Sequence, residues 1–205
     1  MKDKLTRYTT LFITWIFNPL LIPTFGFLIV MNKIPGVEYY SFRVKSILAI
    51  IIFISTFIFP GIFIMLATLN RKLFQENAVK TSKIMPYLIT GLSTYLGAQF
   101  LGKLPVTEIF RLIMLGICIL IVVSFLVHIR WNISEHLVAL GGLWGILIAM
   151  NFKFGMDILL LFISVLIVSG IVASSLIYQE KHTPAQVYSG FAMGFAVLFT
   201  VIIFI

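Results

Sequence analysis

The chain alternates between long apolar runs and short polar segments. A run of about 20 apolar residues is the length that a helix needs to cross the ~30 Å hydrocarbon core of a membrane. Seven candidate runs occur, at residues 11–31, 46–69, 84–101, 109–129, 137–151, 156–178 and 187–205. The pattern therefore predicts an all-α fold, a polytopic transmembrane helical bundle of six to seven spans that forms one domain over residues 1–205.

Two of these runs depart from a simple membrane-spanning helix. Asn18-Pro19 and Pro23 interrupt the first run. Because proline lacks the N–H group that continues a helix, this run is expected to be kinked or re-entrant. The fifth run has only about 15 residues and would cross a membrane only with help from its flanks. These two runs are the reason for predicting a range of span numbers.

Composition supports a membrane location. The chain is 60% hydrophobic and 11% charged, whereas about 25% of residues are charged in soluble domains. The basic start, residues 1–4, leads into a long apolar run without a small-residue cleavage site, so no cleavable signal peptide is expected. The net charge of +8 is spread over short loops, which favours lipid headgroups over nucleic acid as partners. Cys118 is the only cysteine, which leaves no disulfide and no thiolate metal site. We expect an integral protein of a bacterial cytoplasmic (inner) membrane.

Topology brings three polar loops to one face of the membrane. If every run crosses, the loops 70–83, 130–136 and 179–186 share a face with the N-terminus. This face carries 9 Lys and Arg residues against 6 on the other, which favours the cytoplasmic side. Without Lys80 and Lys83, which are candidate ligands, the comparison is 7 against 6 and does not fix the orientation.

Each of the three loops leads into a helix, and helix N-termini attract anions. Lys80 and Lys83 lie three residues apart, so they either clasp one anion on a shared helix face or extend to the membrane boundary as ordinary flanking lysines. In the second loop, Asn132 or Ser134 is the expected cap before an interfacial His136. Near His182, Thr183 and Gln186 have the spacing of a capping box, with Pro184 at the first helical position.

Together the three segments resemble the motifs of a known family. They read Lys80, Lys83 and Pro86, then Ile133-Ser134-Glu135-His136, then Ser175-Leu176 followed by His182 and Gln186. Over about residues 76–200 this order is similar to that of the type 2 phosphatidic acid phosphatase family, the membrane lipid phosphatases related to glucose-6-phosphatase and vanadium haloperoxidases. That family carries Lys-x6-Arg-Pro, Pro-Ser-Gly-His and Ser-Arg-x5-His-x3-Asp.

The resemblance implies roles for the matched residues. His182 would attack phosphorus and form a phosphohistidine, and His136 would protonate the leaving group and then activate water. Lys80, Lys83, Ser134 and Ser175 would bind the phosphate oxygens. Gln186 would take the place of the aspartate that orients the nucleophile. No metal or cofactor is implied, and the expected partner is a membrane lipid, a phosphorylated lipid or isoprenoid substrate.

The sequence departs from the family pattern at four positions. Leu176 and Met85 stand where arginines are expected, Glu135 replaces a glycine, and Gln186 replaces an aspartate. Two alternatives follow. The chain is either a divergent lipid phosphate or diphosphate phosphatase, or a non-catalytic pseudoenzyme of the same fold that binds anionic lipid headgroups or acts as a membrane subunit. A transporter is less favoured because the chain has no inverted repeat and no mid-span carboxylates. The oligomeric state stays open.

Overall fold

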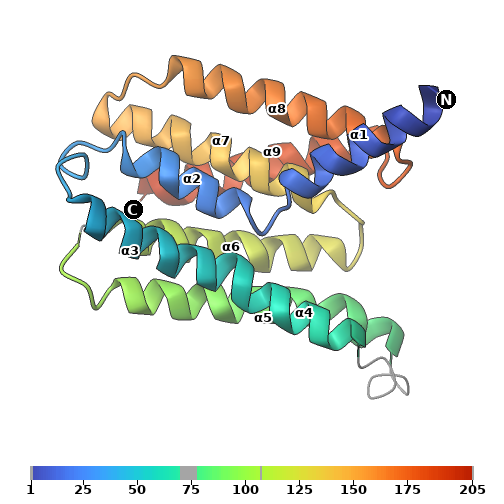
Figure 1. Cartoon of the computed structure of the whole chain (residues 1–205), viewed down its shortest axis with the longest axis horizontal. Coiled ribbons are helices and arrows are strands. Elements are labelled where there is room, and N and C mark those ends of the chain that lie inside the picture. Colours follow the sequence, from blue (N-terminus) through green and yellow to red (C-terminus); the bar gives the residue numbers. More distant parts are fainter. Residues whose placement is uncertain (1, 70–77, 107, 205) are drawn as a thin grey trace.

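The computed structural model of the chain describes residues 2–69, 78–106 and 108–204, and these residues form helices and no strand (Figure 1). The elements are α1 (Lys2–Ile16), α2 (Ile22–Met31), α3 (Phe42–Phe53), the π-helix η1 (Ile54–Ile58), α4 (Phe59–Leu69), α5 (Ala78–Leu101), α6 (Ile109–His128), α7 (Glu135–Phe154), α8 (Leu159–Tyr178) and α9 (Pro184–Phe204).

Within the described ranges, five helical segments are long and apolar enough to cross a membrane. They are Phe42–Leu66, Ile109–His128, Glu135–Phe154, Leu159–Tyr178 and Pro184–Phe204. The chain is therefore an all-helical protein with the features of an integral membrane protein. The fifth run reaches the length of a membrane span with its flanks, as expected, because α7 has 20 residues. Its polar flanks, including Glu135 and Lys153, continue the helix rather than end it.

The first run is broken into two helices. The Asn18 side chain accepts a hydrogen bond from the Leu20 N–H at 3.0 Å, and the Leu21 N–H donates to the Asn18 carbonyl at 2.8 Å. This tight turn, with Pro19 inside it, separates α1 from α2. Figure 1 shows α2 continuing from the turn toward the end of the bundle opposite the N-terminus. The interruption that Asn18-Pro19 predicts is therefore present.

A π-helical segment lies between α3 and α4. The five residues of η1 connect the two α-helices without a loop. Such wide helical turns are rare and often occur near functional sites. Ser55 and Thr56 in η1 are buried, and Ser55 packs where a side chain on Gly97 of α5 would lie. The segment therefore turns its two hydroxyl-bearing residues into the bundle.

The helices α7 and α9 form the most extensive helix pair. Glycines on both helices let the backbones approach closely. A Cβ on Gly145 would lie 2.7 Å from the Phe195 carbonyl oxygen, and a Cβ on Gly190 would lie 3.0 Å from the Ser134 carbonyl oxygen. The Ser134 N–H donates to the Gln186 carbonyl at 3.3 Å. The starts of α7 and α9 are thus joined directly.

The polar segments named from the sequence lie at one end of the bundle. Figure 1 places the N-terminus, the α6–α7 connection, the α8–α9 connection and the start of α5 together at this end, which we call the polar end. This agrees with the expected alternation of the chain across the bundle. The helix starts of α5, α7 and α9 therefore all point their N–H groups toward the same side.

Candidate functional site

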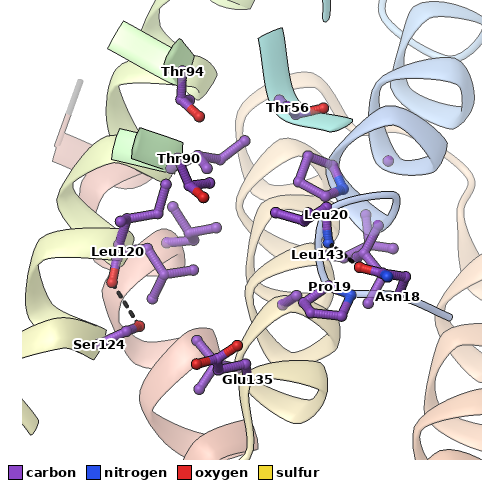
Figure 2. A pocket seen from close by; sticks show the side chains of 18 of the residues that line it. Asn18, Pro19, Leu20, Thr56, Thr90, Thr94, Leu120, Ser124, Glu135 and Leu143 are labelled. Atoms are coloured by element: carbon purple, nitrogen blue, oxygen red, sulfur yellow. Dashed lines mark hydrogen bonds between the residues drawn. The ribbon is translucent and has the colours of Figure 1, made fainter. Parts of the chain in front are cut away.

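A cavity of about 400 Å³ lies inside the bundle, between α2, η1, α4, α5, α6, α7 and α9 (Figure 2). Most of its wall is apolar, and Phe27, Ile64, Ile117, Leu143 and Leu198 contribute to it. Along α7 the lining extends from Glu135 to Ile146, which corresponds to about 16 Å at 1.5 Å per residue. The cavity is therefore long and runs parallel to the helices.

The cavity begins at the polar end beside a hydrogen-bonded pair. The Tyr87 hydroxyl of α5 donates to the Glu135 carboxylate of α7 at 2.6 Å. Glu135 occupies the first turn of α7, where the helix dipole stabilises a negative charge. The Tyr87 ring also lies against Phe125 and His128, with centroids 5.6 and 5.4 Å away. This pair connects α5 to α7 across the cavity entrance.

His136, the neighbour of Glu135, lines the same cavity and is held by α1. Its Nε2 lies 3.2 Å from the Thr14 carbonyl oxygen. Since a carbonyl only accepts, Nε2 carries the proton and donates. Thr14 lies in the last turn of α1, where carbonyls lack a helical donor. The Thr14 hydroxyl also accepts from the Gln179 side-chain amide at 3.5 Å. The break in the first run therefore supplies the group that orients His136.

His182 lies near His136 but outside the cavity lining. It is half-buried, and its Nδ1 is buried without a hydrogen-bond partner. Both His182 and Lys181 interact electrostatically with His136. The two histidines of the family-like motifs thus lie at the same end of the bundle, but only His136 lines the cavity.

Gln186 makes the contacts of a helix cap. Its side-chain oxygen accepts from the Thr183 N–H at 3.0 Å, and the Thr183 hydroxyl accepts from the Gln186 N–H at 3.4 Å. The capping box expected from the sequence is present. Since the Nδ1 of His182 has no hydrogen-bond partner, Gln186 does not orient this ring in the structure.

The two serines named from the sequence lie in different surroundings. Ser134 is fully buried at the N-cap position of α7, and its hydroxyl has no partner; Asn132 lies outside the helix. The Ser175 hydroxyl donates to the Ile171 carbonyl at 2.8 Å, and the residue lines a separate groove between α1 and α8. Ser134 therefore lies at the joined starts of α7 and α9, whereas Ser175 has its own partner elsewhere.

The remaining described residues of the family-like motifs lie partly in the core and partly in the cavity wall. Leu176 is buried in the hydrophobic core, where the family pattern has an arginine. Pro86 lines the cavity. The side chains of Lys80 and Lys83 lie outside the described residues. Over the described ranges, no group of three or more His, Cys, Asp or Glu residues is placed to hold a metal ion.

Sequence reasoning missed several residues of the cavity. Asn18 was noted only as part of a helix break, and Tyr87 was not singled out, yet both line the cavity. The hydroxyl residues Thr56, Thr90, Thr94 and Ser124 were not singled out (Figure 2). The spacing of Thr90 and Thr94, four residues apart in an apolar helix, was the available signal for a polar stripe on one helix face.

Comparisons with models of known protein families, with curated proteins and with solved structures find no match for this chain. A function for this chain is therefore inferred from the geometry of the site.

Proposed function

We propose that this protein binds a phosphorylated lipid, with the lipid chain in the cavity and the head group at the joined starts of α7 and α9. The proposal includes six to seven membrane spans, in which the α1–α2 unit and α5 cross beside the five segments described above, and a location in a bacterial cytoplasmic membrane. The proposal also includes the lipid-phosphatase-like architecture that the sequence motifs suggest.

The observation that carries the proposal is the long apolar cavity that begins beside polar side chains. Its volume of about 400 Å³ is within the usual range for ligand sites, ~300–1,000 Å³. Burying hydrocarbon against such a wall stabilises a complex by about 0.8 kcal/mol per CH₂ group. A lipid chain therefore fits both the shape and the chemistry of the wall.

Several groups at the polar end suit an anionic head group. The unpaired N–H groups at the start of a helix and the helix dipole attract anions. Lys181 adds a positive charge, and the buried Ser134 hydroxyl and His182 Nδ1 both lack partners. Glu135 is negative, but its hydrogen bond to Tyr87 holds it toward α5. We place the head group at the start of α7, where the cavity begins, beside the start of α9.

Binding without turnover is the better-supported form of this proposal. A phosphohistidine mechanism needs a group that orients the nucleophile, and the Gln186 side chain bonds to Thr183 rather than to His182. Leu176 supplies no charge for the phosphate oxygens. The second candidate is hydrolysis of the lipid phosphate, and the unpartnered Nδ1 of His182 beside His136 is the observation in its favour.

Filling the cavity tests lipid binding. Ala139 lines the cavity and Ala196 is exposed on α9, so Ala139→Phe and Ala196→Phe add the same side chain inside and outside. Binding of dioleoyl phosphatidic acid to the purified full chain would be measured by native mass spectrometry. We expect Ala139→Phe to weaken binding at least about tenfold, or ~1.4 kcal/mol, and Ala196→Phe to leave it unchanged. Equal binding by wild type and Ala139→Phe would contradict the proposal.

Phosphate release from the same lipid tests the second candidate. If the protein hydrolyses phosphatidic acid, His182→Ala abolishes release, whereas Gln186→Asp raises it by restoring a carboxylate to the orienting position. Phosphate release by His182→Ala at the wild-type rate would rule out hydrolysis at this site. The same conclusion would follow if the wild-type protein binds the lipid but releases no phosphate.

A further inference from the structure

The Thr94 hydroxyl is a buried hydrogen-bond donor that faces the cavity without a partner. Thr94 is 1% exposed, lines the cavity, and its Oγ1 has no hydrogen bond. Figure 2 shows it in the part of the cavity remote from Glu135. Along α5 it follows Tyr87 by seven residues, about 10 Å. This hydroxyl therefore lies deep in the cavity, at the same end as Thr90 and Thr56.

The neighbouring hydroxyls show why this one is unusual. A threonine or serine in a helix commonly donates to the carbonyl four residues earlier. Thr56 donates in this way to Ile52 at 2.9 Å, Thr90 to Pro86 at 2.7 Å and Ser124 to Leu120 at 2.7 Å. These hydroxyls line the same cavity but are already satisfied.

Competition from the adjacent serine explains the free hydroxyl of Thr94. The carbonyl that Thr94 would use belongs to Thr90, and this oxygen already accepts from the Ser93 hydroxyl at 3.1 Å. Ser93 is itself buried. A buried donor without an acceptor is unfavourable. A bound molecule that supplies an acceptor to Thr94 therefore gains binding free energy.

We infer that Thr94 donates a hydrogen bond to an ester carbonyl of the bound lipid, so that the ligand is a fatty-acyl ester rather than a polyprenyl phosphate. The inference rests on the proposed function, because it assumes that a lipid occupies the cavity. A polyprenyl chain is hydrocarbon below its phosphate and offers no acceptor to Thr94. A glycerophospholipid carries ester carbonyls below its head group, between the polar end and the hydrocarbon tails.

Three lipid probes and three variants test the inference. The probes are dioleoyl phosphatidic acid, its dialkyl ether analogue, which lacks the carbonyls, and a polyprenyl phosphate. Binding to the purified full chain would be compared by native mass spectrometry. One hydrogen bond corresponds to a preference of roughly 2- to 12-fold, so we expect wild type to prefer the ester over both other probes by such a factor.

The variants separate the free donor from hydroxyls in general. We expect Thr94→Val to remove the preference for the ester, Thr94→Ser to retain it, and the control Thr90→Val to retain it, since the Thr90 hydroxyl is already bonded to Pro86. Equal binding of ester and ether by wild type, preference for the polyprenyl phosphate, or a preference that survives in Thr94→Val would overturn the inference alone. Failure of all three probes to bind would overturn the proposed function with it.

Discussion

Replacing Gly194 with alanine tests whether glycine contacts hold α7 and α9 together. A Cβ at this position would overlap the Val138 carbonyl and lie 2.9 Å from the Gly142 N–H nitrogen. Both neighbours are backbone atoms, so neither moves aside as a flexible side chain would. Relief requires the helices to separate, and this would disturb the bond between the Ser134 N–H and the Gln186 carbonyl.

The expected cost follows from two opposing effects. Overpacking a tight interface destabilises a protein by about 1–3 kcal/mol, and contact with backbone favours the upper end. Alanine also has a higher helix propensity than glycine, by about 1 kcal/mol. The net loss for Gly194→Ala is therefore about 2 kcal/mol. In a chain of this size each kcal/mol shifts Tm by roughly 2–4 °C, so we expect Tm to fall by about 4–8 °C.

Thermal unfolding of the purified protein in detergent measures this shift. Gly170→Ala is the matched control, because a Cβ there would meet nothing within 4 Å and only the helix propensity changes. We expect the control to raise Tm slightly. The reasoning is refuted if Gly194→Ala melts at or above the wild-type temperature.

Three further substitutions at the polar end have expected effects on Tm, measured in the same way. Tyr87→Phe removes the donor to Glu135 and should cost about 1 kcal/mol, because the carboxylate is exposed and its interaction is screened; an unchanged Tm would show that the bond contributes nothing. Thr183→Ala removes a helix cap and should cost about 1 kcal/mol, whereas Thr183→Ser should not. Ser134→Ala should leave the lipid-free protein equally stable or more stable, because it deletes an unpartnered buried hydroxyl; a fall in Tm would reveal a partner for it.

The sequence predicts the parts of the fold that depend on local pattern. Apolar runs at helix spacing locate the helices, and the Thr183 to Gln186 spacing gives the capping box. Pro19 marks the break between α1 and α2. The pattern fails where polar residues belong to a helix, as at the start of α5: the apolar run begins at residue 84, whereas the helix begins at Ala78.

The contacts of the candidate site depend on residues distant in sequence. The pairing of His136 with Thr14 joins positions 122 residues apart, and that of Tyr87 with Glu135 joins positions 48 apart. No local rule connects such pairs. The free hydroxyl of Thr94 is also hidden from the sequence, because it depends on which of two adjacent hydroxyls takes one carbonyl.

The π-helix η1 sets the register of the whole segment from α3 to α4. Its inward positions recur every four residues, at Leu48, Ile52, Thr56, Pro60 and Ile64. In an ideal α-helix each step of four residues turns about 40° too far, so such a stripe would soon wind away from the bundle. The wider turn of η1 absorbs part of this rotation. Deleting one residue there would restore regular α-helical turns and leave α4 facing nearly the same way, because four residues at ~100° each turn the helix about as far as the five residues of η1. We therefore expect Ile64 to stay in the cavity wall after such a deletion.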